Sequence, residues 1–204
     1  MSEIMFLKPA ERTALFIDGA SLYHAAKNLG FDVDFRSLRD LFEKRSLFRR
    51  AYYYAAIPDT DEYSPLRPLT DWLAYNGFHL ILKTAREFTD HSGRRRIKGN
   101  MDVELAVDLL EQAPNLDHAV IISGDADLRR AVEAVQSRGV RVSVISSTRS
   151  TPPMISDDLR RQADRFIELA EIAPEFTRRS AEPRPRQAPI RHPADINSDE
   201  TLPT

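Results

Sequence analysis

The stretch ALFIDG, at residues 14–19, is an apolar run that ends on an aspartate and a glycine. A second run of this kind, AVIISGDAD, occupies residues 119–127. Short apolar runs that stop at turn residues are typical of buried strands in a parallel sheet. Ligands of open α/β sheets bind just outside the carboxyl ends of such strands. We therefore expect Asp18, Asp125 and Asp127 to lie together at one edge of a sheet.

The rest of the chain alternates between strand patterns and helix patterns. Apolar runs predict strands at 13–17, 49–57, 79–84, 117–122, 140–145 and 165–169. Helical spacing predicts helices at 21–29, 35–44, 65–75, 101–112, 127–138 and 156–163, several of which are followed by a glycine. Strands that alternate with helices of about ten residues imply right-handed crossovers and a parallel sheet that is covered on both faces.

Composition narrows the class of protein. The 204 residues are 42% hydrophobic and 29% charged, as in ordinary soluble domains. The chain has no cysteine, which excludes disulfides, thiolate metal sites and cysteine nucleophiles. A net charge of −2 gives no overall signature of nucleic-acid binding, so any basic surface must be local. No apolar run approaches the roughly 18 residues of a membrane span, and no signal-peptide pattern opens the chain, so we expect a cytoplasmic protein.

Three segments are expected along the chain. Residues 1–11 form a short leader, and residues 12–173 form a single domain. From residue 174 to residue 204, prolines and arginines recur and apolar residues almost vanish. Because such a segment buries too little apolar surface to offset the entropy of ordering it, we expect a disordered tail.

Four aspartates are candidates for a metal site: Asp18, Asp102, Asp125 and Asp127. Each of them alone has an ordinary interpretation, because aspartate caps helices and favours their first turn. Three separate acidic segments at one edge would repel one another unless a cation lay between them. Hard divalent cations such as Mg²⁺ and Mn²⁺ prefer oxygen ligands. We interpret the four aspartates as the catalytic centre of a metal-dependent phosphodiester site, which needs no histidine or lysine base.

Residues 86–98 interrupt the alternation of strands and helices. Two charged stretches flank a His-Ser-Gly turn there, which is typical of a hairpin or a mobile flap. Basic residues on this segment, or just after the last aspartate, are candidates for contact with a phosphate backbone: Arg86, Arg94, Arg95, Arg96, Lys98 and Arg129. Most short basic runs are only solvated surface, but the position beside the acids favours binding. Tyr23, one turn into the first helix, either stacks on a base or packs in the core.

Other catalytic templates are absent from the sequence. The chain has no Gly-x-Gly-x-x-Gly and no Walker motif, so dinucleotide and P-loop sites lose support. It has no nucleophile elbow and no histidine in the context of a catalytic triad. Ala20 stands where a phosphatase of the haloacid-dehalogenase type has its second aspartate.

Four segments stand out by their order and spacing: FIDGASLY at 16–23, KGNMDVELAVD at 98–108, SGDAD at 123–127 and RGVRV at 138–142. Together they resemble the NYN domain family, in particular its bacterial LabA-like branch, within the PIN-like nuclease superfamily. The resemblance covers about residues 12–170. It implies a PIN-like three-layer α/β sandwich, with a central, mainly parallel sheet of five to six strands and helices on both faces. Two positions depart from the family pattern, because Ser21 replaces the usual asparagine and Leu128 replaces an aromatic residue.

The resemblance implies a ribonuclease that depends on Mg²⁺ or Mn²⁺ and hydrolyses RNA phosphodiester bonds. Its acidic positions carry over to the four aspartates named above as metal ligands, and Ser21 is expected to position a water or a phosphate. The expected partner is single-stranded RNA, with no membrane contact, and a homodimer stays open. Two alternatives also stay open: a non-catalytic RNA-binding or regulatory protein that keeps the acids for structure, and a small phosphatase.

Overall fold

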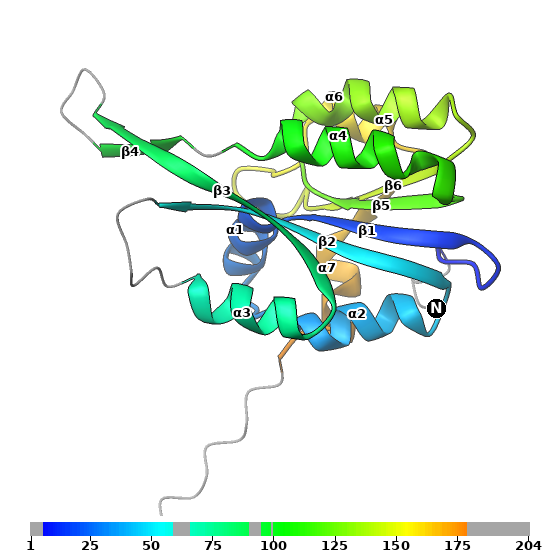
Figure 1. Ribbon diagram of the computed structural model, residues 1–204, viewed down its shortest axis with the longest axis horizontal. Helices are drawn as coiled ribbons and strands as arrows, with labels where there is room; N and C mark the ends of the chain where they lie inside the picture. The colour runs from blue at the N-terminus through cyan, green and yellow to red at the C-terminus, as the bar shows by residue number, and fades with distance from the viewer. Residues whose placement is uncertain (1–5, 59–65, 90–94, 99, 179–204) are drawn as a thin grey trace, which may run out of the picture.

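The described part of the chain folds around a seven-stranded sheet. A computed structural model describes residues 6–58, 66–89, 95–98 and 100–178. The strands are β1 (Arg12–Asp18), β2 (Leu47–Pro58), β3 (Phe78–Thr89), β4 (Arg95–Lys98), β5 (His118–Ile122), β6 (Arg141–Ser146) and β7 (Arg165–Glu168). They lie in the order β4-β3-β2-β1-β5-β6-β7, and every neighbouring pair is parallel except β3 and β4 (Figure 1).

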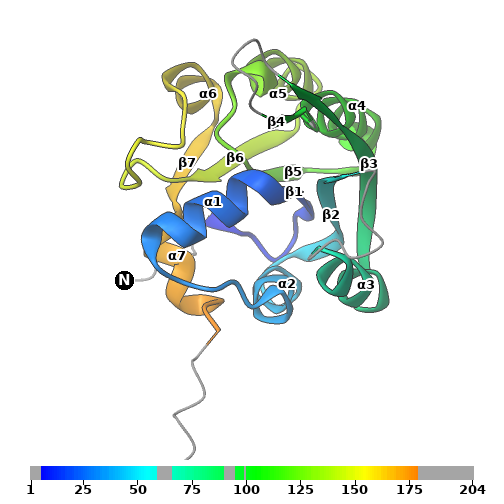
Figure 2. The same ribbon diagram turned by 90° about the vertical axis from the view of Figure 1, so that its left-hand side faces the viewer.

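Helices cover both faces of this sheet, which makes a three-layer fold (Figure 1, Figure 2). One face carries α1 (Gly19–Leu29), α2 (Phe35–Glu43), α3 (Arg67–Tyr75) and α7 (Leu169–Ile172). The other face carries α4 (Asp102–Gln112), α5 (Arg129–Gln136) and α6 (Asp157–Gln162). The predicted fold class is confirmed, with β4 as an antiparallel addition at one edge. Among the described residues, no helix has the length and apolar character that a membrane span requires.

The central strand β1 shows why the sheet needs continuous apolar runs. Leu15 and Ile17 pack in the core beneath α1 and α2, whereas Ala14 and Phe16 pack in the core beneath α4 and α5. Successive side chains of a strand point to opposite faces, so a strand that is covered on both faces has no polar side. The prediction of a buried strand at this position is confirmed.

The sheet changes its winding direction between β1 and β5. From β1 the chain passes through α1 and α2 to β2 on one side, while from β5 it passes through α5 to β6 on the other side. α1 and α5 lie on opposite faces of the sheet (Figure 2). The carboxyl ends of β1 and β5 therefore lie at the point where the winding of the sheet reverses, which is where such folds bind ligands.

The helix α1 begins at Gly19 rather than at Ser21, where the sequence pattern predicts its start. Asp18 is its N-cap and accepts hydrogen bonds from the backbone N–H groups of Ala20 and Ser21. Because Asp18 provides the cap, the helix starts directly after β1. α1 ends at Gly30 as predicted, with a φ of 77° in the left-handed region that favours glycine.

Strand β3 is longer than the predicted strand at 79–84 and runs to Thr89. Its last part pairs with β4 in antiparallel register, with Arg86 opposite Lys98 and Phe88 opposite Arg96. The hairpin predicted at 86–98 is therefore present, although its turn lies outside the described residues. The apolar pattern of β3 stops before its last, charged part. Charged side chains are tolerated there because the hairpin lies at the edge of the sheet. The hairpin extends beyond the carboxyl end of β1 (Figure 1).

Both ends of the described chain add to the core beyond the domain limits expected at 12 and 173. Phe6 is 1% exposed and belongs to the core beneath α2. Phe176 is fully buried and packs against Phe31. The composition of a segment shows where apolar residues become rare, but a single apolar side chain can still fill a gap in the core. Phe176 of the segment expected as a tail at 174–204 is therefore part of the core, and the segment from residue 179 onward lies outside the described residues.

Candidate functional site

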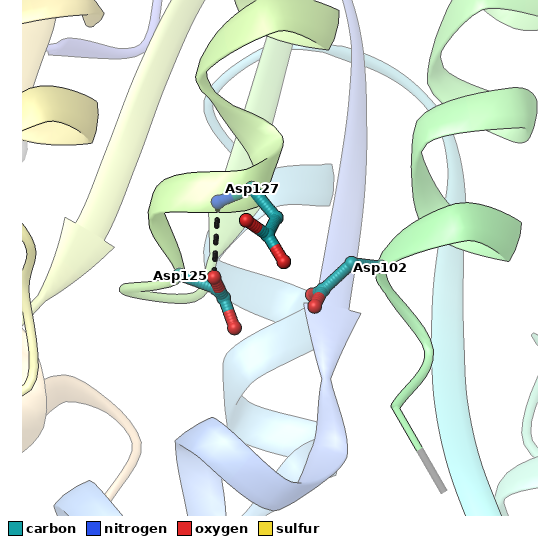
Figure 3. Close-up of side chains that lie close together, drawn as sticks. All are labelled: Asp102, Asp125 and Asp127. Atoms are coloured by element: carbon teal, nitrogen blue, oxygen red, sulfur yellow. Dashed lines mark hydrogen bonds between the residues drawn. The ribbon is translucent and has the colours of Figure 1, made fainter.

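Three aspartates meet at the carboxyl edge of the sheet (Figure 3). Asp125 and Asp127 come from the turn after β5, and Asp102 is the first residue of α4. Each offers one carboxylate oxygen, and these oxygens all lie within 4.8 Å of one another. Asp102 is 8% exposed whereas Asp127 is exposed, so the group has a buried side and an open side. Carboxylate oxygens at this spacing suit a hard divalent cation.

The turn that carries Asp125 and Asp127 is held from two sides. The Asp125 N–H donates to the Ser123 hydroxyl oxygen at 3.3 Å, and the Asp127 N–H donates to Asp125 Oδ1 at 3.0 Å (Figure 3). Gly124 leaves no room for a side chain, because a Cβ there would lie 1.8 Å from the carbonyl oxygen of Met154. The turn is therefore packed directly against the connection between β6 and α6.

Asp102 occupies the first turn of α4, where the free N–H groups of the helix favour a negative charge. Its own N–H donates to the side-chain oxygen of Asn100 at 2.6 Å. Burial, followed by the negative charges of Asp125 and Asp18, raises the pKa of the Asp102 carboxyl to about 6. Burial contributes most to this shift, and the neighbouring carboxylates also oppose the charge on Asp102. A cation between them would remove this repulsion, so the donor set fits a divalent metal ion.

Asp18 lies outside this group of three. Its carboxylate accepts hydrogen bonds from the N–H groups of Ala20 at 3.1 Å and Ser21 at 3.3 Å, and the Ser21 hydroxyl donates to it as well. The Ser123 hydroxyl donates to the same carboxylate across 3.4 Å. The structure thus groups three of the four candidate aspartates and joins the fourth to them through Ser123.

Ser123 is a site residue that the sequence pattern does not single out. It is 1% exposed and contacts both Asp18 and Asp125. The sequence offers only a weak indication of this role, namely that a polar serine stands between a buried apolar strand and a glycine. Ser21 also contacts Asp18, because its hydroxyl donates a hydrogen bond to that carboxylate. The Ser21 oxygen can then accept a hydrogen bond from a water, but its hydroxyl hydrogen is not available to a phosphate group.

The candidate RNA-binding residues lie on several elements. The basic residues of the hairpin are Arg86 on β3 and Arg95, Arg96 and Lys98 on β4, while Arg94 lies outside the described residues. Arg129 begins α5, and its guanidinium contacts Gln162 at 3.4 Å and Glu133 at 3.6 Å. Tyr23 is 58% exposed on α1, so the alternative in which it packs in the core is wrong.

The sequence model of the NYN domain matches residues 12–170 of this chain. The chain belongs to the NYN domain family. It is 31% identical over 195 residues to the "Low amplitude and bright protein LabA" of Synechococcus elongatus. This similarity covers 93% of the chain and 100% of that protein.

A solved structure has the same fold. The chain resembles a protein of unknown function, VPA0982 from Vibrio parahaemolyticus, with a TM-score of 0.65 and 25% identity. The likeness covers 82% of this chain and 96% of that chain.

The resemblance to NYN domains is confirmed over the predicted range by the match of the NYN sequence model. Of the two departures from the family pattern, Leu128 is fully buried in the core beneath α5, and Ser21 contacts Asp18.

Proposed function

We propose that this NYN protein is a Mg²⁺- or Mn²⁺-dependent ribonuclease that hydrolyses RNA phosphodiester bonds at the carboxyl edge of its sheet. The observation that carries this proposal is the convergence of Asp102, Asp125 and Asp127 within 4.8 Å. These residues come from two separate segments, and helix capping alone does not explain why the segments meet. NYN domains are generally ribonucleases, which supports RNA as the substrate.

The proposed cation ligands are Asp102, Asp125 and Asp127, with Asp18 beside them. A bound divalent cation supplies an activated water and stabilises negative charge on the reacting phosphate. The other residues of the site fix the positions of the carboxylates. Asn100 holds the first residue of α4, and Ser123 holds the carboxylate at the end of β1. The Ser21 oxygen is left to accept a hydrogen bond from a water at the edge of the site.

Single-stranded RNA would reach this centre along the hairpin of β3 and β4. The candidate contacts on the hairpin are Arg86, Arg94, Arg95, Arg96 and Lys98. Their positive charges would bind the phosphate backbone without regard to sequence. The hairpin extends past the end of β1, which carries Asp18 (Figure 1). Arg129 adds a further positive charge close to the aspartates in the sequence.

A second candidate function is that of a non-catalytic RNA-binding or regulatory protein. One observation favours it: the Asp18 carboxylate already accepts hydrogen bonds from the start of α1 and from two serines, as a purely structural residue would. In this case RNA is bound and not cut.

Incubation of the purified protein with end-labelled single-stranded RNA, in Mn²⁺ or in chelator, separates these functions. We expect cleavage in Mn²⁺ that the chelator abolishes. Asp125→Asn should slow it by orders of magnitude, because the transition state loses charge stabilisation. Asp157→Asn is the matched control, since this aspartate has an 82% exposed side chain and lies outside the group.

Two results would contradict the ribonuclease. Stable RNA in Mn²⁺, bound with the same affinity by the wild type and by Asp125→Asn, would favour the regulatory protein. Equal RNA decay by both proteins, unaffected by chelator, would indicate a contaminating nuclease.

A further inference from the structure

A groove with a volume of about 1130 Å³ lies beside Asp18, among α1, the end of β2 and α3. Asp18 and Gly19 line it, so the groove adjoins the candidate metal centre. The connection between α1 and α2 supplies a further wall. Because ligand pockets typically measure about 300–1,000 Å³, this groove has room for more than one planar ring.

The walls of the groove include several aromatic and aliphatic side chains. Phe31, Phe35 and Leu69 lie at the border of the hydrophobic core, are only partly buried, and line the groove. Tyr53 also lines the groove, with 3% exposure, and its ring meets the Phe35 ring edge to face at a centroid distance of 5.6 Å. Flat apolar surfaces of this kind bind planar rings by stacking and by burial of apolar area.

Gly19 brings the groove and the carboxylates close together. A Cβ at this position would lie 2.5 Å from the Tyr53 hydroxyl and 2.9 Å from the carbonyl oxygen of Tyr54. The absence of a side chain therefore lets the Tyr53 ring lie directly against the turn that follows Asp18. Since Asp18 and the aromatic residues line the same groove, one extended ligand can contact both.

The rim of the groove carries an exposed aromatic ring and positive charges. Tyr23 is 58% exposed, and Lys27 Nζ lies 5.8 Å from the centroid of its ring. Lys27 and Arg178 both line the groove, together with the acidic Asp32. Apolar walls below a rim with two cationic side chains match a polymer in which planar rings are joined by phosphates.

We propose that this groove receives unpaired bases of the RNA strand whose backbone passes Asp18, an inference that rests on the proposed function. Aromatic side chains reach the faces of bases only where a strand is unpaired, so the groove selects single-stranded RNA over duplex RNA. Tyr23 stacks on one base at the rim, and Phe31 and Phe35 contact the base that lies deeper. Every base has a flat face, so the preference for sequence is weak.

A fluorescent base analogue tests this directly. Asp125→Asn protein is titrated with a short single-stranded RNA that contains 2-aminopurine, whose fluorescence falls on stacking. We expect quenching on binding, and an affinity at least about fivefold weaker when Tyr23→Ala is added. Tyr23→Phe keeps the ring and should restore both signals. Tyr75→Ala is the matched control, because Tyr75 is 90% exposed on α3 outside the groove and should leave binding unchanged.

Two further ligands localise the effect to the bases. A duplex of the same sequence should bind without quenching, since its bases are already stacked. A strand with abasic sugars keeps its phosphates and loses the rings, so we expect the protein with and without Tyr23→Ala to bind it equally. If Tyr23→Ala weakens the affinity for the abasic strand as well, Tyr23 contacts the backbone. This result would overturn the assignment of the groove to bases.

The outcomes distinguish the groove from the ribonuclease. Unchanged quenching and affinity in Tyr23→Ala, while the wild type still cleaves RNA in Mn²⁺, would overturn the base-binding groove alone. If the quenching requires Tyr23 but the wild type does not cleave RNA in Mn²⁺, the base-binding groove is supported and the ribonuclease is overturned. A dimer in sedimentation that Tyr23→Ala abolishes, without any quenching by RNA, would assign the groove to a second copy of the chain and overturn the proposal.

Discussion

The Ser123 hydroxyl donates a hydrogen bond to the Asp18 carboxylate across 3.4 Å, which joins residues 105 positions apart at the ends of β1 and β5. The same oxygen accepts the Asp125 N–H at 3.3 Å. The Asp18 carboxylate and the Asp125 backbone therefore share one positioning partner. Partners of this kind fix the orientation of metal ligands and affect metal affinity.

We expect Ser123→Ala to weaken Mn²⁺ binding by about tenfold or more. Its free energy of unfolding should fall by about 1–3 kcal/mol, because the two hydrogen bonds of the Ser123 hydroxyl are lost. Calorimetric titration with Mn²⁺ and unfolding in urea measure the two effects. Ser143→Ala is the matched control: this buried serine bonds to His118 at 2.8 Å and should lose similar stability with no change in Mn²⁺ affinity. Equal Mn²⁺ affinity in both variants would rule out the role of Ser123.

Mn²⁺ should raise the melting temperature of the wild type, because it binds the grouped carboxylates of the folded state. At about a hundred times the dissociation constant, linkage gives about 2.7 kcal/mol of added stability. Asp127→Asn should reduce this rise, and Asp157→Asn should not. Scanning calorimetry in Mn²⁺ and in chelator is the measurement. Identical melting curves in the two buffers would count strongly against a metal centre.

Replacing Arg94, Arg95 and Arg96 with alanine should weaken RNA binding roughly equally across sequences. Each lost phosphate contact should also reduce the salt dependence, by about 0.7 in the log–log slope for a single strand. Fluorescence anisotropy at several salt concentrations gives both quantities. A control with the same charge change replaces Arg160, Arg161 and Arg165, which lie on α6 and β7 at the opposite edge of the sheet. If the two triple variants have the same slope, the hairpin does not contact RNA.

His118 is a buried neutral base at the amino end of β5, away from the candidate metal centre. Burial, followed by the charge of Arg141, lowers the pKa of its ring to about 3. Lys8 acts in the same direction, while Glu11 and Asp164 oppose the shift. Arg141 donates a hydrogen bond to Nδ1 at 3.0 Å, which requires that nitrogen to be unprotonated.

A base whose folded pKa lies below its ordinary value stabilises the protein above the ordinary pKa, and this stability is lost as pH falls. For His118 the loss begins near pH 6.5 and reaches about 2 kcal/mol at pH 5. His118→Gln should flatten the dependence of unfolding free energy on pH between 8 and 5, measured in urea with chelator. The raised pKa of Asp102 acts in the opposite direction but equally in both proteins, so it cancels in the difference. Parallel profiles would contradict the prediction.

Ending the chain after Arg178 should leave the melting temperature unchanged, whereas ending it after Glu175 should lower it clearly. The shorter chain lacks Phe176, which is fully buried against Phe31. Loss of a buried phenylalanine side chain costs about 3–5 kcal/mol. Thermal unfolding of the two truncations provides the comparison. Equal stability would mean that the Phe176 ring contributes little to the core.

Local sequence accounts for much of the fold. The run ALFI predicts β1 because a strand that is covered on both faces needs only apolar side chains. Gly30 marks the end of α1 because its backbone adopts a left-handed conformation. The position of the aspartates at the carboxyl edge follows from the same alternation of strands and helices.

The candidate site was harder to predict, because one side chain can serve two purposes. An aspartate between a strand and a helix caps the helix or holds a cation with the same oxygens, and only the structure shows Asp18 doing the first. Ser123 and Phe176 act through contacts with distant segments, which a local pattern does not contain. The groove beside Gly19 arises in the same way, from packing among α1, β2 and α3.

The reversal of winding between β1 and β5 is set by the path of the chain and not by any one side chain, because α1 and α5 lie on opposite faces of the sheet. A descendant that lost every aspartate by genetic drift would still keep this switch point at the carboxyl edge. New chemistry could then arise there by exchanging a few residues at strand ends, while the two cores stayed intact. In this architecture the catalytic repertoire and the folding stability can evolve separately, and relatives of one shape can have diverged in activity.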